Sequence, residues 1–170
     1  PNFWGGVLRI GAGARLERAG SFWSGLIDDV RIYDRAISRG FVLEEGFETG
    51  DFSAFNWKHE GDAYWQITST ERHSGLYSAR PGDIGDDQTS TLKVTVDCKT
   101  GKVAFNVKTS SEQVFDKLVF RMDGRTAGEW SGIMDWERVS FPVSTGTHTL
   151  EWSYVKDESS LRGDDTAWLD

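Results

Sequence analysis

Four aromatic residues have positions that suit contact with a ligand. Trp and Tyr rings offer flat, electron-rich faces on which the C–H face of a sugar ring can stack. The four flank turns, begin expected strands or alternate out of phase with an expected core residue: Trp57, Tyr64, Trp130 and Trp136. Arg121, on the outward face of an expected strand, could donate hydrogen bonds to hydroxyl groups. These residues predict a shallow sugar-binding face, although the same rings could instead cover the ends of the core.

The sequence contains no arrangement of residues typical of catalysis. The stretch most similar to the Gly-x-Ser-x-Gly nucleophile elbow is Gly-Glu-Trp-Ser-Gly at residues 128–132. Its serine is the fourth residue, whereas the motif needs it as the third. The histidines His59, His73 and His148 are far apart along the chain, and Cys98 has no partner pattern. Acids that are adjacent in sequence do not supply the two carboxylates that a glycosidase needs across a cleft. We therefore expect a chain that is not itself an enzyme.

Most of the chain after residue 46 alternates apolar and polar residues. This period of two is typical of half-buried β-strands, and it is clearest at residues 92–96, 103–107, 118–122, 139–143 and 150–154. Glycine-containing turns separate the runs. The pattern predicts an all-β antiparallel sandwich of the jelly-roll type. Its inward side is expected to hold three tryptophans: Trp65, Trp152 and Trp168.

Composition limits the class of protein further. With 13% aromatic residues the 170-residue chain is too rich in aromatics for a disordered protein. A net charge of −8 disfavours nucleic acid as a partner, because an acidic surface repels phosphates. The sequence contains no run of about 18 apolar residues, so it predicts no membrane span. The single cysteine excludes an internal disulfide.

The first 40 residues differ from the rest. Residues 8–11 read Leu-Arg-Ile-Gly, and residues 25–38 read Gly-Leu-Ile-Asp-Asp-Val-Arg-Ile-Tyr-Asp-Arg-Ala-Ile-Ser. This pattern resembles the C-terminal end of a laminin-G-like, concanavalin-A-like domain. A complete domain of that type is far longer, so the resemblance implies that residues 1–40 are a partial lectin-like β segment. It implies no binding residue in this segment.

Residues 41–170 carry a second resemblance. Residues 46–52 read Gly-Phe-Glu-Thr-Gly-Asp-Phe, residues 73–79 read His-Ser-Gly-Leu-Tyr-Ser-Ala, and residues 165–170 read Asp-Thr-Ala-Trp-Leu-Asp. These stretches resemble MAM-like and carbohydrate-binding-module-like jelly rolls, which are frequent in large secreted bacterial proteins. Because both ends of the chain resemble cut domains, we expect a segment of a larger multidomain protein.

The second resemblance also implies a structural calcium ion. Modules of this kind often hold calcium where the first and last strands meet, between the acid of an early Phe-Glu pair and the Asp of the final strand. The matching residues here are Glu48 and Asp170, with Asp51 and Asp165 as possible helpers. Calcium prefers hard oxygen ligands of this kind. The alternative is that these acids face water or cap turns.

Together these patterns favour a non-catalytic accessory module that binds a polysaccharide or glycan by aromatic stacking. We expect it to be extracellular, secreted or on the cell surface, with the neighbouring domains of its parent protein as further partners. A rival interpretation is an adhesin-type spacer or protein-interaction module with no sugar site. A third is a regulatory or substrate-positioning part of a hydrolase whose active site lies elsewhere.

Overall fold

The computed structural model describes residues 43–158 and 162–170. The chain divides into two units between Gly40 and Phe41, and all of the described residues belong to the second unit. The predicted lectin-like segment at residues 1–40 therefore lies outside the described residues.

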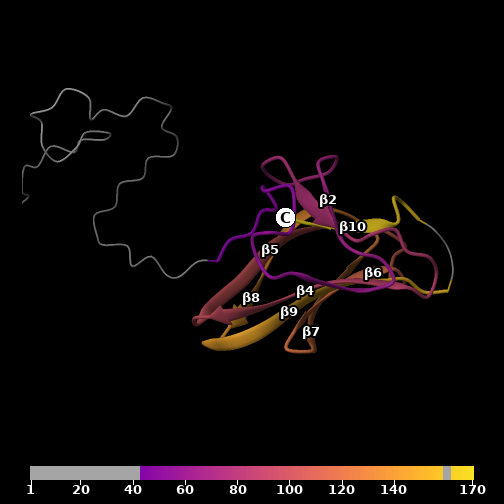
Figure 1. Cartoon of the computed structure of the whole chain (residues 1–170). Coiled ribbons are helices and arrows are strands. Elements are labelled where there is room, and N and C mark those ends of the chain that lie inside the picture. The colour runs from indigo at the N-terminus through magenta and orange to yellow at the C-terminus, as the bar shows by residue number, and fades with distance from the viewer. Residues whose placement is uncertain (1–42, 159–161) are drawn as a thin grey trace, which may run out of the picture. The chain divides into compact units, whose positions relative to one another are not determined.

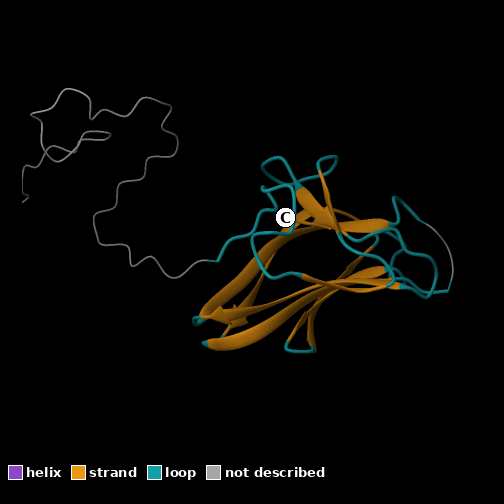
Figure 2. Cartoon of the chain, viewed as in Figure 1, coloured by secondary structure: helices purple, strands orange, loops and turns teal. Residues whose placement is uncertain are grey.

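The described residues form strands joined by turns and loops, with no helix among them (Figures 1 and 2). Accordingly, this part of the chain offers no helix that could cross a membrane. The ten strands are β1 (Lys58–Gly61), β2 (Gln66–Thr68), β3 (Ser78–Arg80), β4 (Thr89–Cys98), β5 (Gly101–Ser110), β6 (Lys117–Met122), β7 (Arg125–Ser131), β8 (Ile133–Val143), β9 (Gly146–Val155) and β10 (Thr166–Leu169).

The strands form two antiparallel sheets that face each other (Figure 2). One sheet has the order β1-β4-β9-β6-β7, and we call it sheet A. The other has the order β2-β3-β10-β5-β8, and we call it sheet B. Successive strands often lie in opposite sheets, as β4 and β5 do. The predicted all-β jelly-roll sandwich is thus confirmed.

The alternation seen in the sequence places the core. In β9, Leu150, Trp152 and Tyr154 point inward and are at most 7% exposed. The turn between β6 and β7 consists of Asp123 and Gly124, with φ angles of 53° and 76°. Positive φ at both central residues is the geometry of a tight hairpin turn, and Asp and Gly adopt it readily. Register in this hairpin is therefore set by the turn.

An aromatic cluster joins the two sheets. Phe120 of sheet A lies 5.0 Å from Trp152 of the same sheet and 4.9 Å from Phe105 of sheet B, measured between ring centroids. Phe105 in turn lies 5.9 Å from Phe141 on β8. Such ring pairs contribute about 0.5–1.5 kcal/mol each beyond the burial of their area. The cluster explains much of the aromatic content of the sequence.

Trp168 is buried as predicted, but not in this core. Its neighbours Ala167 and Leu169 belong to the core cluster, so Trp168 points to the outer face of sheet B. It is only 6% exposed there, and the Lys108 ammonium lies 5.7 Å from its ring centroid. The outer face of sheet B is therefore partly covered.

Candidate functional site

The loop between β2 and β3, residues 69–77, is held by two carboxylates from distant parts of the chain. Glu48 accepts hydrogen bonds from the backbone N–H groups of Leu76 (2.9 Å) and Tyr77 (3.2 Å). Asp170 accepts from the N–H groups of His73 (2.9 Å) and Ser74 (3.0 Å). The structure thus brings the two main calcium candidates to one loop, which we call the clamped loop.

Gly75 allows Glu48 to approach the clamped loop closely. A Cβ atom at Gly75 would lie 2.2 Å from Glu48 Oε1, which is too close for any side chain. Gly75 also has a φ of +60°, a conformation that glycine adopts without strain. The glycine of the sequence His-Ser-Gly-Leu-Tyr-Ser is therefore required by the contact with Glu48.

Asn106 adds an oxygen beside Asp170. The two residues exchange backbone hydrogen bonds of 2.7 and 3.0 Å between β5 and the chain end, so their side chains lie on the same face. Asn106 is 7% exposed, and its Oδ1 has no hydrogen-bond partner among the described residues. The two carboxylates that hold the clamped loop and the Asn106 amide oxygen are all hard oxygen donors, the kind that calcium prefers. The described residues contain no cluster of three or more acidic, histidine or cysteine side chains, so loop carbonyls would complete any such site.

The outer face of sheet B carries a polar and aromatic group beside the clamped loop. The Trp136 indole on β8 donates a hydrogen bond of 3.1 Å to Glu71 Oε1, and the same oxygen lies 3.1 Å from Lys108 Nζ. The His73 ring meets the Trp136 ring edge-on, with centroids 5.9 Å apart. We call Glu71, His73, Lys108 and Trp136 the Trp136 site. It combines one partly buried ring with donors and acceptors suited to hydroxyl groups.

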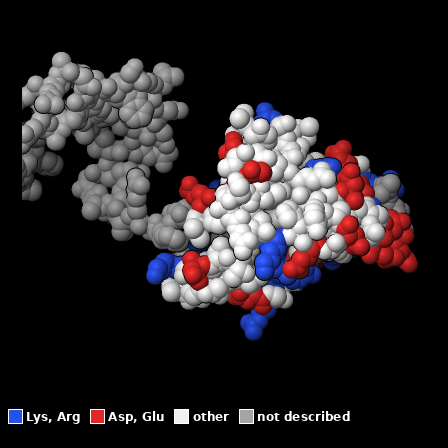
Figure 3. Space-filling model, in the orientation of Figure 1, with Lys and Arg blue, Asp and Glu red and all other residues white. Residues whose placement is uncertain are grey.

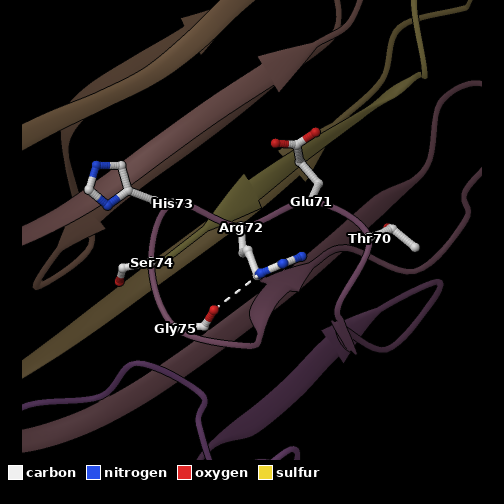
Figure 4. Close-up of a pocket in the computed structure, with 6 residues that line it drawn as sticks. All are labelled: Thr70, Glu71, Arg72, His73, Ser74 and Gly75. Atoms are coloured by element: carbon white, nitrogen blue, oxygen red, sulfur yellow. Dashed lines mark hydrogen bonds between the residues drawn. The ribbon is translucent and has the colours of Figure 1, made fainter.

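A shallow hollow of about 560 Å³ lies next to this site and is lined by Thr70 to Gly75. Figure 4 shows Arg72 pointing across the loop to the Gly75 carbonyl, while His73 and Glu71 point away from it. The Arg72 guanidinium donates bonds of 3.2 Å to Gly75 O and 2.7 Å to Ser69 O. Arg72 therefore stabilises the hollow's shape from inside.

Two of the four aromatic residues predicted to contact a ligand are partly buried and pack against the core. Trp57 lies 6.0 Å from both Phe47 and Trp152, measured between ring centroids, and its Nε1 donates to Glu45. Trp130 packs 5.7 Å from Phe105. Nearness to a turn did not reveal which way these rings point.

Tyr64 and Arg121 lie apart from the Trp136 site. Tyr64 is 68% exposed in the loop after β1, where its ring lies 5.3 Å from that of His59. Arg121 lies on the outer face of sheet A and donates a bond of 2.9 Å to Glu151. The structure therefore does not gather the predicted ligand-binding residues into one surface.

Asp51 and Asp165, the two acids predicted to help bind calcium, make their contacts outside the clamped loop. Asp51 accepts a bond of 3.0 Å from Ser53 N–H, and hydrogen bonding from the Ser53 side chain and backbone lowers the pKa of Asp51. Asp165 precedes β10, whereas Asp170 follows it, and Asp165 pairs with Lys156. Asp51 thus stabilises a turn, and Asp165 belongs to a different polar cluster.

Comparison with known proteins supports the fold. No protein-family model and no curated protein matches the chain. Among solved structures, the K1 cleaved adhesin domain of Lys-gingipain from Porphyromonas gingivalis W83 matches with a TM-score of 0.53 and 15% identity, over 75% of this chain and 96% of that domain. The CBM22-1-CBM22-2 tandem domain of Paenibacillus barcinonensis Xyn10C matches with a TM-score of 0.50 and 17% identity, over 75% of this chain and 42% of that one.

A third match extends the range of proteins that contain this fold. The secreted serine protease VesC from Vibrio cholerae has a TM-score of 0.50 and 13% identity, over 62% of this chain and 23% of the protease. This chain thus spans less than two thirds of the length of that protein and of the tandem domain. The likenesses show a jelly-roll fold shared with adhesin and carbohydrate-binding domains, while the laminin-G-like and MAM-like resemblances stay predictions.

Several residues of the site were not singled out from the sequence. Glu71 and Lys108 had no distinguishing pattern, and His73 was considered only as one of three scattered histidines. Asn106 lies in an ordinary alternating strand. The one available signal was the stretch at residues 73–79, which belongs to the clamped loop.

Proposed function

We propose that residues 41–170 form a non-catalytic carbohydrate-binding module of a larger extracellular protein, with the Trp136 site as its ligand contact. The observation that carries the proposal is the partly buried Trp136 ring, which contacts Glu71 and His73, two of the residues that line the hollow. A sugar ring stacked there would find Glu71 and Lys108 within reach of its hydroxyls. The carbohydrate-binding tandem domain from Paenibacillus barcinonensis, which shares the fold, supports this choice.

We propose in addition that calcium stabilises the clamped loop through Glu48 and Asp170, with Asn106 as a third side-chain donor. The bound ion would supply positive charge between the carboxylates. Ordering this loop also orders Glu71 and His73, because they belong to it. Calcium would then act on sugar binding through the loop and not by contact with the sugar.

The test is a titration with soluble polysaccharides followed by tryptophan fluorescence. Trp136→Ala is expected to weaken binding about fivefold or more, since a stacked ring contributes on the order of 1 kcal/mol or more. Tyr64→Ala is the matched control, because it removes an exposed ring at a different place. Binding that survives Trp136→Ala unchanged would remove the Trp136 site from the proposal.

A second candidate function is protein interaction, as in an adhesin or spacer. Val114, Phe115 and Ile133 are 67%, 53% and 77% exposed. Val114 and Phe115 are consecutive, and the Val114 N–H donates a bond of 2.9 Å to Ser131 Oγ. Because Ser131 is two residues before Ile133, the three residues lie near one another. A folded sample that binds no polysaccharide would favour this candidate.

A further inference from the structure

A buried polar cluster lies between the end of β9 and the start of β10, outside the Trp136 site. Lys156 follows β9, and its side chain is 1% exposed. Its Nζ contacts Asp165 Oδ2, and Tyr154 Oη donates to Asp165 Oδ1 at 3.3 Å. The ammonium and the carboxylate are therefore held in contact by their strands, with little water around the lysine.

A second carboxyl group lies close to this pair. Asp116 is fully buried just before β6, and its Oδ1 accepts a bond of 3.1 Å from the N–H of Asp157. Its Oδ2 is also buried and has no hydrogen-bond partner among the described residues. Burial raises the pKa of Asp116, and the charges of Lys156 and Asp165 both act on it. Asp116 is thus a carboxyl group that can hold a proton, bonded to the residue that follows Lys156 and within the electrostatic influence of the pair, with no direct hydrogen bond to Lys156 or Asp165 in the described structure.

From this geometry we propose that Lys156 and Asp165 join in an intramolecular isopeptide bond, with Asp116 carrying the proton. A proton moves from the Lys156 ammonium to the Asp165 carboxylate, which leaves a neutral amine and a neutral acid. Nζ attacks Cγ, and the new N–C bond replaces the bond from Cγ to its hydroxyl oxygen. Asp116 takes the proton lost by Nζ and gives it to that oxygen, which leaves as water. The ion pair thus becomes an amide and one water molecule, with atoms and charge balanced and no further reagent.

Proximity and dryness favour this step. Well-oriented groups held in contact reach effective concentrations of about 10⁵–10⁸ M, and the burial of the Lys156 side chain opposes hydrolysis of the bond once it has formed. Among the described lysines Lys156 is the only buried one. The bond would connect sheet A to sheet B, because β9 and β10 lie in different sheets.

Lys93 provides an internal comparison. Its Nζ lies 2.8 Å from Glu60 and 3.3 Å from Glu151, but its side chain is 24% exposed. Lys93 therefore has acidic partners, but its side chain is not shielded from water. We expect no bond at Lys93.

The test is the intact mass of the purified chain, measured directly and after prolonged incubation at neutral pH. The proposal expects the chain to be lighter by one water molecule than its sequence. Trypsin should then fail to cut after Lys156, and residues 139–162 should remain joined to residues 163–170. Cleavage after Lys93 should stay normal.

Two variants make the outcome decisive. Lys156→Arg keeps the positive charge but removes the nucleophile, so it should retain its full mass. Asp116→Asn should slow the loss of water, and Asp116→Glu should restore it in part. The proposal would be overturned if the unchanged chain has its full mass. It would also be overturned if the loss of water persists in Lys156→Arg and maps to the Asp123-Gly124 turn. Equal rates with and without Asp116→Asn would overturn the part assigned to Asp116.

Discussion

Asp116 shows how burial alone changes the chemistry of one residue. Its side chain lies in the interior, where one oxygen has no hydrogen-bond partner within residues 43–158 and 162–170, and desolvation raises its pKa above the usual value for Asp. Because its pKa is higher in the folded state, folding binds a proton. Its contribution to stability is fully present below the unfolded pKa of about 3.9 and is lost as pH rises through the folded pKa.

This predicts that Asp116→Asn flattens the dependence of stability on pH in that window. The amide keeps an acceptor for the Asp157 N–H but does not ionise. The comparison is best made in the Lys156→Arg background, so that no cross-link forms in either protein. The free energy of unfolding is measured by denaturant at several pH values between 4 and 8. Equal pH slopes in the two proteins would contradict the burial argument.

The clamped loop is the element on which the candidate site depends. Four of its backbone N–H groups donate to Glu48 and Asp170, which come from the beginning and the end of the described unit. If calcium binds there, the folded state gains about 2.7 kcal/mol at a calcium concentration 100 times the dissociation constant. The loop and its ion would then respond together to a chelator.

We therefore predict that EDTA lowers the melting temperature of the chain, and that Glu48→Gln and Asp170→Asn reduce this response. Both amides still accept the loop's N–H bonds, so the variants remove charge with little loss of hydrogen bonding. Asp51→Asn is the matched control, because Asp51 bonds only within its own turn. If the response to EDTA is unchanged in Glu48→Gln, the ion lies elsewhere or does not bind.

Five of the six strands with six or more residues could be predicted from the sequence, whereas β7 and the shorter strands could not. Strands β4, β5, β6, β8 and β9 contain the alternating runs that predicted them. Strands β1 to β3 have only three or four residues, too few for a period of two to stand out. The convergence of Glu48 and Asp170 on one loop followed from a family resemblance. The burial of Lys156 had no signal, since lysine is normally exposed.

At the scale of the whole molecule, the aromatic residues divide between core and surface. The sequence alone placed Trp57, Trp130 and Trp136 in one class, because each adjoins a turn or begins a strand. The sandwich separates them. Trp57 and Trp130 pack against the rings that join the sheets, whereas the Trp136 indole bonds to Glu71 on the outer face of sheet B. Alternation of apolar and polar residues predicts that a strand has two different sides. It does not show which side packs against the other sheet.

This division predicts opposite effects for two matched substitutions. Trp130→Ala removes a ring that contacts Phe105 and Phe141, so it should lower the free energy of unfolding by about 3–5 kcal/mol. Trp136→Ala should cost clearly less stability, because that ring lies outside the core cluster, yet it should weaken sugar binding. Denaturant unfolding measures the free energy of unfolding of the two variants, and fluorescence titration measures their affinity for the sugar. Equal losses of stability would mean that Trp136 supports the fold as much as Trp130, and the outer face of sheet B would then have no ring free to bind a sugar.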